Sequence, residues 1–394
     1  MSDSQRLPPE DLLHTLLAES IAADLLADRS EAIPGREALS ERAERIASQQ
    51  PWLLPRDELA SLVRAAVDRI VGLGALQPLI DDPEITEIMV NDPAHIFVER
   101  NGRLESVNVR FRNPSDLRHI IDRIVAPIGR RIDESSPLVD ARLPDGSRVN
   151  AIIPPLAIHG PVLTIRKFSR EPFSLERLVA LKTLSHAMAD LLARSVELRH
   201  SLLISGGTGS GKTSTLNALS LRIPEAERII TIEDAAELQL QHPHLISLEA
   251  RPPNLEGEGE ITIRTLVRNA LRMRPDRIIV GEVRGGEAFD MLQAMNTGHR
   301  GSMTTLHANT AADALIRLES MVLMAGFDMP LAAIRRMIGG AVEIVVQQDR
   351  LADGRRAVTG IDRLQPDGSE RTRLAPIFVF DPPFSWRRVG ANLA

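Results

Sequence analysis

The chain has 394 residues, of which 43% are hydrophobic and 25% are charged, and it contains 26 Pro, 25 Gly and no Cys. This composition is typical of a globular protein with two or three domains, and it excludes a disordered chain, a collagen, a disulfide scaffold and a cysteine-based metal site. The net charge of −6 argues against a generic nucleic-acid-coating protein. No run reaches the ~20 apolar residues of a membrane span, and no secretory signal begins the chain, so we expect a soluble, cytoplasmic protein.

Residues 1–78 are expected to form a helical segment. One apolar face repeats at helical spacing and comprises Leu12, Leu13, Leu16, Leu17, Ile21, Leu25 and Leu26. Pro34 and the following glycine interrupt this helix, and a second one is expected over Arg36–Ser48. Asp57 is expected to start a third helix, which ends near Gly72 because glycine readily terminates a helix.

Residues 79–170 change to short β-like runs with one helix, which predicts a small α+β domain. The expected strands are Glu87–Val90, His95–Glu99, Arg148–Ile153 and Val162–Lys167. Asn101-Gly102 is a hairpin signal, and a helix is expected over Ser115–Val125.

Residues 171–394 alternate strands and helices after a plausible hinge at Glu171-Pro172-Phe173. The expected strands are Leu202–Ser205, Arg228–Ile232, Arg277–Val280 and Ser302–Leu306, and the expected helices are Lys212–Leu221, Ile263–Met273, Glu287–Asn296 and Ala311–Met324. This alternation predicts an α/β domain with a largely parallel sheet. From Val342 onward we expect antiparallel strands with turns at Asp353-Gly354 and Asp367-Gly368.

The strongest motif is a complete phosphate-binding loop, G-x-x-x-x-G-K-T, between a strand and a helix. It comprises Gly206, Gly207, Thr208, Gly209, Ser210, Gly211, Lys212 and Thr213, and Ser214 follows it. The glycines let backbone N–H groups surround phosphate oxygens, Lys212 reaches the β- and γ-phosphates, and the Thr213 hydroxyl holds Mg²⁺. A dinucleotide site is the alternative, because Glu233 follows the loop by about 20 residues. That motif does not require Lys212-Thr213, and nothing else in the chain indicates redox chemistry.

Three further groups follow expected strands, and the carboxyl ends of such strands are where α/β sheets bind ligands. Glu233-Asp234 could hold Mg²⁺ or order a water, or form an acidic cap on the next helix. Glu282 follows Gly281, which stands where an ordinary Walker B strand has Asp, so Glu282 fits a base that polarises water better than a direct metal ligand. His307 could sense the γ-phosphate or be an ordinary satisfied polar residue.

With these four stretches the chain resembles the secretion ATPases of the type II/type IV superfamily, over about residues 78–350. The stretches correspond to that family's Walker A motif, Asp box, atypical Walker B motif and His box. The tight-adherence pilus assembly ATPases look like the closest branch, because of Val90–Pro93, Asp140–Asn150 and Gly281–Glu287. Many pilus extension ATPases carry a four-cysteine zinc site, which this chain cannot form.

The resemblance implies a RecA-like P-loop ATPase domain preceded by a small α+β, PAS-like domain. It also implies a homo-hexamer that hydrolyses ATP with Mg²⁺, in which Arg148 and Arg166 reach the phosphates. The alternative is that Arg148 supports a turn and Arg166 lies at a strand edge. The candidate metal ligands remain those of the motifs, Thr213 and Glu233. Such motors drive pilus assembly or protein secretion through an inner-membrane platform protein, at the cytoplasmic side of the inner membrane. A RecA-like DNA-translocating motor and a non-hydrolysing nucleotide-gated scaffold are the alternatives. Because aromatic residues make up 3% of the chain, no nucleic-acid partner is expected.

Overall fold

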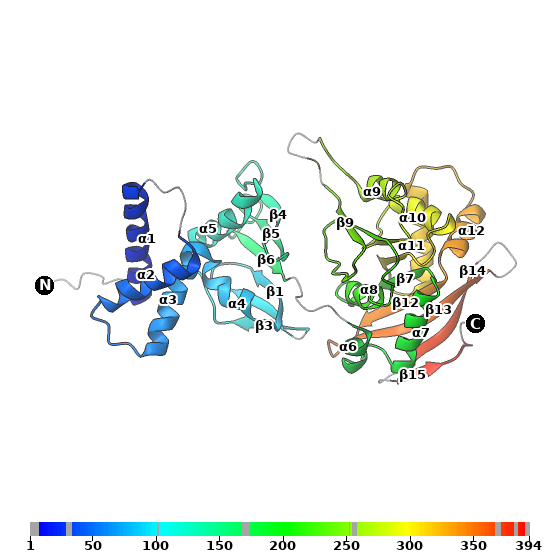
Figure 1. Ribbon diagram of the computed structural model, residues 1–394, viewed down its shortest axis with the longest axis horizontal. Coiled ribbons are helices and arrows are strands. Elements are labelled where there is room, and N and C mark those ends of the chain that lie inside the picture. Colours follow the sequence, from blue (N-terminus) through cyan, green and yellow to red (C-terminus); the bar gives the residue numbers. More distant parts are fainter. Residues whose placement is uncertain are drawn as a thin grey trace. The chain divides into compact units, whose positions relative to one another are not determined.

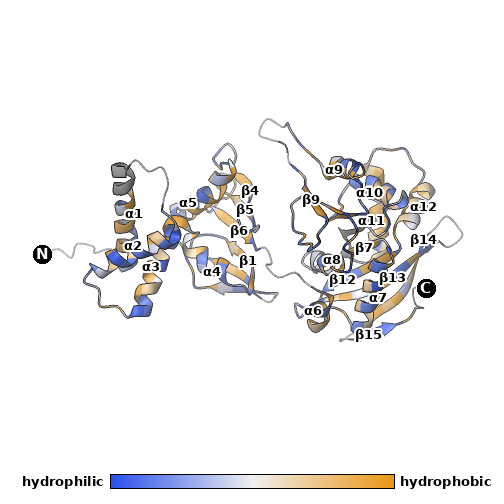
Figure 2. Cartoon of the chain, in the orientation of Figure 1, coloured by the Kyte–Doolittle hydropathy of each residue, from blue (hydrophilic) through white to orange (hydrophobic). Residues whose placement is uncertain are grey.

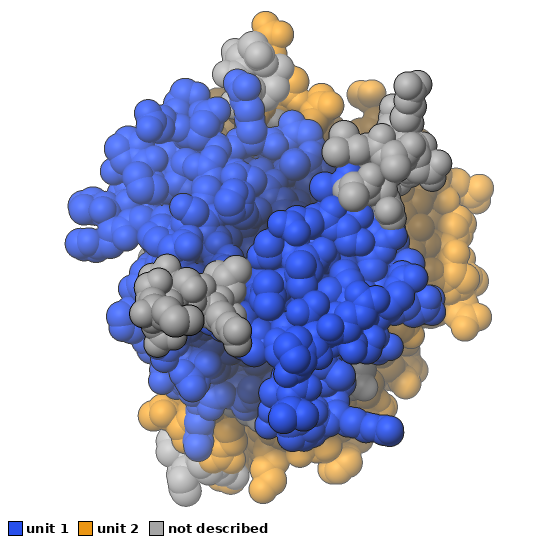
Figure 3. Space-filling model, turned by 90° about the vertical axis from the view of Figure 1, so that its left-hand side faces the viewer, with its two compact units in different colours: residues 1–169 blue, residues 170–394 orange. Residues whose placement is uncertain are grey.

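The computed structural model describes residues 8–28, 34–100, 102–167, 174–251, 253, 258–366, 372–381 and 385–390. The chain divides into two compact units, residues 1–169 and 170–394, which Figure 3 distinguishes by colour. The expected hinge at Glu171-Pro172-Phe173, as well as Asn101 and Asp367-Gly368, lies outside the described residues. Among the helices that are described, none combines the length and the apolar character needed to cross a membrane.

Unit 1 begins with three helices that pack against one another. They are α1 (Pro9–Asp28), α2 (Arg36–Ser48) and α3 (Arg56–Val71). The buried Leu13 of α1 belongs to the same core as the small residues Ala43 and Ala66, which allow the helices to approach closely. Asp68 of α3 is only 3% exposed and accepts a hydrogen bond from Arg36 Nη1, which ties α3 to α2.

The rest of unit 1 is an antiparallel sheet with a helix packed against one face. The strands are β1 (Ile85–Val90), β2 (Ile96–Arg100), β3 (Arg103–Val107), β4 (Leu138–Arg142), β5 (Arg148–Ile152) and β6 (Val162–Arg166), in the spatial order β3-β2-β1-β6-β5-β4. Helix α5 (Pro114–Val125) begins where the Asn113 side chain accepts the N–H of Asp116. Its residue Ile121 shares a core with Ile88 and Ile165 of the sheet.

Side chains of α5 and its flank attach the helices of unit 1 to the sheet. Arg123 donates from Nη1 to Gly72 O at 2.7 Å and from Nη2 to Arg69 O at 2.8 Å, which satisfies carbonyls at the end of α3. Asp11 of α1 pairs with Arg69 and with Arg112, each at 2.8 Å. The helical segment is therefore part of unit 1 and not a separate body.

Unit 2 is built on one mixed sheet, which has nine strands in the described residues. These are β7 (Leu202–Gly206), β8 (Ile229–Glu233), β9 (Leu245–Glu249), β10 (Arg277–Val280), β11 (Met303–His307), β12 (Ile344–Arg350), β13 (Arg356–Pro366), β14 (Thr372–Asp381) and β15 (Ser385–Arg388), in the order β15-β14-β13-β12-β7-β11-β10-β8-β9. Strands β7 to β12 pair in parallel, and β13 to β15 continue the sheet as an antiparallel extension. The expected antiparallel tail is thus correct except for β12, which also pairs in parallel with β7.

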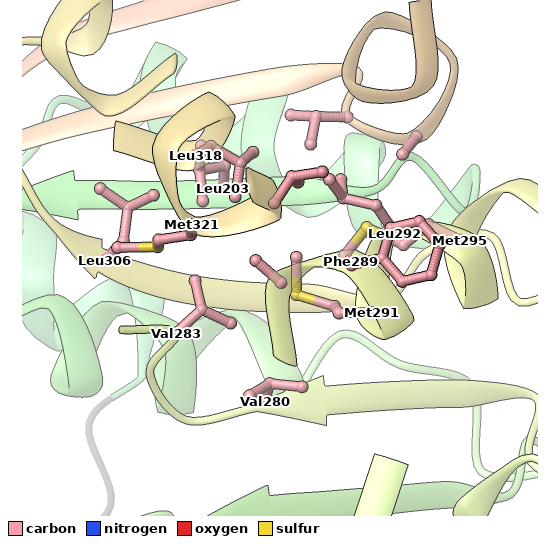
Figure 4. Close-up of a cluster of buried hydrophobic side chains, with 14 of the residues drawn as sticks. Leu203, Val280, Val283, Phe289, Met291, Leu292, Met295, Leu306, Leu318 and Met321 are labelled. Carbon is pink, nitrogen blue, oxygen red and sulfur yellow. The ribbon is translucent and has the colours of Figure 1, made fainter. Parts of the chain in front are cut away.

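Helices cover both faces of this sheet (Figure 1). They are α6 (Leu175–Ala180), α7 (His186–Glu197), α8 (Lys212–Ser220), α9 (Ile263–Ala270), α10 (Glu287–Asn296), α11 (Ala311–Met324) and α12 (Leu331–Ala341). On one face Leu203 and Val280 lie beneath α10 and α11 side chains such as Met291 and Leu318 (Figure 4). Because both faces are covered, every residue of β7, β8 and β10 is buried, and these strands are mostly apolar. Figure 2 colours the chain by hydropathy.

Candidate functional site

The expected phosphate-binding loop connects the end of β7 to the start of α8. Gly209 has φ +69° and Gly211 has φ +96°, a backbone region that favours glycine. A Cβ on Gly206 would lie 2.0 Å from the backbone oxygen of Gln348 on β12, so only glycine allows this close approach. Thr213 and Ser214 follow Lys212 in the first turn of α8, and both are half-buried.

The order of the parallel strands brings the expected site residues to one edge of the sheet. Strands β7, β11, β10 and β8 are successive neighbours. His307 is aligned with Gly206, and the backbone N–H of Gly281 donates to Ile232 O at 2.9 Å. The carboxyl ends of these strands therefore carry the phosphate loop, His307, Glu282 and Glu233 together, as expected from the sequence.

Lys212 and His307 are in direct contact within this edge. The Lys212 ammonium, in a side chain that is 6% exposed, donates to Gly206 O at 3.1 Å and to Gly207 O at 2.9 Å. It also lies 3.3 Å from Nδ1 of His307. Because an ammonium can only donate, Nδ1 must accept, so the imidazole carries its proton on Nε2. Burial, followed by the charge of Lys212, lowers the pKa of His307, which favours this neutral form.

Glu282 has one oxygen that is held and one that retains acceptor capacity. Its Oε2 accepts a hydrogen bond from Arg284 Nη2 at 2.8 Å. Its Oε1 lies 3.0 Å from His307 Nε2, but the contact lacks hydrogen-bond alignment. Within the described part of the chain, this buried Oε1 has no hydrogen-bond partner. A buried carboxylate oxygen in this condition is suited to accept a proton or a hydrogen bond from a reacting water.

Glu233 is buried at the same edge and is turned toward the backbone that follows it. Glu233 is only 4% exposed, and its Oε1 accepts hydrogen bonds from the N–H groups of Glu237 at 2.9 Å and Leu238 at 3.0 Å. Burial raises the pKa of this carboxyl to about 7, against the lowering effect of the two N–H groups. The sequence offered an acidic cap on the next helix as one interpretation of Glu233, but the described residues 234–244 form no helix and β9 follows them. The carboxyl instead binds the backbone of this connecting segment, and a role in holding Mg²⁺ stays a prediction.

The residues present fit a magnesium ion that is held mainly by its substrate. Within the described ranges, no group of three or more His, Asp or Glu side chains is placed to hold a metal alone. Mg²⁺ commonly binds through one or two protein oxygens, phosphate oxygens and waters. The Thr213 hydroxyl at the start of α8 fits that mode, with Glu233 at the same sheet edge.

Arg148 and Arg166 lie in unit 1, on neighbouring strands and opposite each other. The register pairs Arg148 of β5 with Arg166 of β6, and it also pairs Arg148 with Arg142 of β4. Glu87 of β1 is the next residue in this row. Arg148 and Arg166 are exposed. Sequence reasoning missed Arg142, although it stands six residues before Arg148 across a turn, the spacing of a hairpin pair.

Residues of β12 and β13 also contact the phosphate loop, and sequence reasoning did not single them out. Arg356 Nε donates to Gly209 O at 2.9 Å. Thr215, one turn into α8, donates to Gln348 Oε1 at 2.8 Å. The available signal was the Gln347-Gln348 pair, two polar residues that directly follow the apolar run 344–346.

Comparisons with known proteins identify the family of the chain. A family model described as "Type II/IV secretion system protein" matches residues 70–367. The chain is 38% identical over 315 residues to the putative conjugal transfer protein Rv3659c of Mycobacterium tuberculosis (strain H37Rv), which covers 78% of this chain and 89% of that protein. It is 36% identical over 337 residues to the type IV secretion system protein VirB11 of Brucella suis biovar 1, covering 76% of this chain and 90% of that protein.

A solved structure supports the fold. The crystal structure of the pilus retraction motor PilT with bound ADP matches with a TM-score of 0.52 at 22% identity, over 77% of this chain and 81% of that chain. The fold expected from the sequence, α/β with a RecA-like P-loop ATPase domain, is thereby confirmed. The chain belongs to the type II/IV secretion system protein family, within the secretion ATPase superfamily that its motifs indicated.

Proposed function

We propose that this chain is the subunit of a hexameric motor that hydrolyses ATP to power pilus assembly or protein secretion across the bacterial envelope. The observation that carries the proposal is the arrangement of Lys212, His307 and Glu282 beside a complete phosphate loop. A buried ammonium lies 3.3 Å from the imidazole, and the imidazole lies 3.0 Å from a carboxylate oxygen that has acceptor capacity left. This arrangement favours ATP hydrolysis rather than nucleotide binding alone.

Each residue has a task that its geometry supports. The backbone N–H groups of the loop and the start of α8 bind phosphate oxygens, and Lys212 turns from the loop carbonyls toward the β- and γ-phosphates. Glu282, fixed by Arg284, orients the attacking water and accepts its proton. His307, neutral and in contact with Lys212, responds when a γ-phosphate attracts the ammonium. The Thr213 hydroxyl would hold Mg²⁺ together with the phosphates, and the bound ion would supply charge neutralisation there.

Family membership and the names of the relatives support the cellular role. VirB11 is named as a type IV secretion system protein and PilT as a pilus retraction motor. For this chain we propose the corresponding place: cytoplasmic, peripheral at the inner membrane, with an inner-membrane platform protein as partner and other copies of itself in the ring. The motifs quoted above favour the tight-adherence pilus branch.

ATP turnover by the purified full-length protein tests the proposal. Lys212→Ala should abolish turnover and weaken nucleotide binding. Glu282→Gln should still bind ATP but turn over at least ~100-fold more slowly, the usual scale for losing a general base. Glu260→Gln makes the same chemical change at an exposed position and should have no effect. A wild-type protein that binds ATP without turnover would instead be a nucleotide-gated scaffold.

The oligomeric state needs a separate measurement. Mass photometry with a non-hydrolysable ATP analogue should show a species of six subunits. A protein that stays monomeric at micromolar concentration under every nucleotide condition would contradict the ring.

A further inference from the structure

Strand β12 carries two buried glutamines directly after an apolar run. Gln347 is 6% exposed and Gln348 is 1% exposed. A buried side-chain amide is unfavourable unless its oxygen and its NH₂ group are hydrogen-bonded. The partners of these two amides therefore show which parts of the structure β12 holds in place.

The Gln347 side chain connects β12 to two other segments, the strand β7 and the turn after β11. Gln347 is aligned with Ser205 of β7, and Ser205 is aligned with Leu306 of β11. Gln347 Oε1 accepts a hydrogen bond from Ser205 Oγ. Gln347 Nε2 donates to Asn309 O at 3.0 Å and lies 3.5 Å from Ala308 O. One amide thus reaches from β12, across the strand that precedes the phosphate loop, to the turn that follows His307.

The orientation of this amide is itself fixed. Gln347 Nε2 also donates to Asp349 Oδ1 at 3.2 Å, and Asp349 Oδ2 accepts from Thr359 of β13 at 2.6 Å. The NH₂ group therefore faces acceptors on both sides, while the oxygen faces the Ser205 hydroxyl. Only an amide supplies both an acceptor and donors at this position.

Gln348 makes a different set of contacts. Its Oε1 accepts from Thr215 Oγ1 at 2.8 Å, and a Cβ on Gly211 would lie 2.9 Å from its Nε2. It supports the phosphate loop and α8, and none of its hydrogen bonds in the described residues reaches the turn after His307. The two adjacent glutamines thus provide a matched pair for experiment.

From these contacts we infer that Gln347 is a positioning residue, one that couples the phosphate loop to the turn after His307 and so holds His307 in place against Lys212 and Glu282. Ser205 immediately precedes the loop, and Asn309 lies two residues beyond His307, so the amide ties the residue before the loop to the segment that follows His307. The effect on turnover rests on the ATP hydrolysis proposed above, whereas the coupling itself does not.

The test compares Gln347→Met with Gln348→Met in the full-length protein. Gln347→Met should lower kcat about 10- to 100-fold, the scale for a small misplacement at a reacting centre. The affinity for a non-hydrolysable ATP analogue should change less than about 3-fold, because Lys212 and Thr213 remain. Hydrogen–deuterium exchange of peptides covering residues 303–310 should be faster in Gln347→Met and unchanged in Gln348→Met. If Gln347→Met does not fold, Ser205→Ala removes only one hydroxyl and should change exchange and kcat in the same direction.

A double variant separates positioning from a general structural effect. If Gln347 acts through His307, His307→Ala combined with Gln347→Met should be no slower than His307→Ala alone. Multiplied losses, or equal acceleration of exchange in Gln348→Met, would overturn the inference. If the wild-type protein shows no turnover, the proposed function fails, and the exchange comparison alone still decides whether Gln347 holds the turn.

Discussion

The side chain of Glu233 occupies the space that any side chain at Gly281 would need. A Cβ at position 281 would lie 2.8 Å from Glu233 Cγ and 3.1 Å from its Oε1. Glu233 cannot easily move aside, because its carboxyl accepts the N–H groups of Glu237 and Leu238. The buried carboxylate at this sheet edge is thus supplied by β8, and the neighbouring strand β10 is followed by a glycine. The side chain of Glu233 therefore explains why glycine stands at position 281, where an ordinary Walker B strand has aspartate.

The first prediction is that Gly281→Ala destabilises the protein by about 1–3 kcal/mol, the usual cost of overpacking a tight site. The new methyl group would meet Glu233 Cγ, so the combination with Glu233→Ala should lose less stability than the two single changes added together. Urea unfolding of the four proteins measures this coupling. Strictly additive losses would show that the two side chains do not compete for space.

The second prediction concerns the pH dependence of stability, because burial raises the pKa of Glu233 to about 7 from 4.5. The folded protein then binds this proton more tightly than the unfolded chain does. The stabilising contribution is complete below about pH 4.5 and is lost as the pH rises through about 7. Glu233→Gln keeps the acceptor for both N–H groups and removes the titration.

Urea unfolding between pH 5 and pH 8 should therefore show the advantage of Glu233→Gln over the wild type growing with pH, by at most about 3 kcal/mol. Glu260→Gln changes an exposed carboxylate that does not contribute to the pKa of Glu233, and it serves as the control. An advantage of Glu233→Gln that is the same at every pH would contradict the raised pKa.

The site could be predicted from the sequence where a local pattern determines the chemistry. Lys212 and Thr213 follow a glycine-rich loop in unbroken sequence, and His307 and Glu282 follow apolar runs, so a parallel sheet brings them to one edge. The tertiary contacts behind them leave no such pattern. Gln347 is 142 positions from Ser205, and its function depends on which strands are neighbours.

The strands of the fold could likewise be predicted where a local sequence pattern determines them. Strands buried on both faces have continuous apolar sequences, so β7, β8 and β10 were recognisable. Strand β12 was assigned to an antiparallel tail because its sequence cannot show that its other edge pairs in parallel with β7. For Glu233 the sequence permits a helix cap or a metal ligand, because it does not show that β9, and not a helix, follows β8.

The third prediction is that Lys212→Met raises the pKa of His307. Burial is the largest cause of the lowered pKa of this imidazole, and the ammonium of Lys212 is the next. Removing that charge should make the imidazole easier to protonate, and NMR of histidine-labelled protein would follow the change during a pH titration. Lys182→Met removes an exposed lysine and should leave the titration unchanged. If the pKa of His307 is unchanged in Lys212→Met, the ammonium at 3.3 Å from Nδ1 has no electrostatic effect on the imidazole.

The row of arginines on the sheet of unit 1 is the basis of the last prediction. Arg142, Arg148 and Arg166 are direct cross-strand neighbours, and like charges in such positions repel each other. Glu87, at the end of the row, compensates one of them in register. A row of this kind is suited to bind a polyanion, because arginine makes paired hydrogen bonds to phosphate.

The fourth prediction is that Arg148→Ala combined with Arg166→Ala leaves unit 1 folded but weakens the response to ATP. Charge-assisted hydrogen bonds contribute about 1.5–3 kcal/mol each, so losing each arginine should reduce affinity for an ATP analogue about 10- to 100-fold. The arginines belong to unit 1 and the phosphate loop to unit 2, so we propose that ATP binding changes the distance between labels on the two units. Distance measurements between one label in each unit should then show a smaller ATP-driven change in the double variant than in the parent.

Arg103→Ala combined with Arg110→Ala removes the same charge elsewhere in unit 1 and should leave the change intact. An ATP-driven change in the Arg148 and Arg166 variant as large as in the parent would mean that these two arginines are structural and that other residues couple the units.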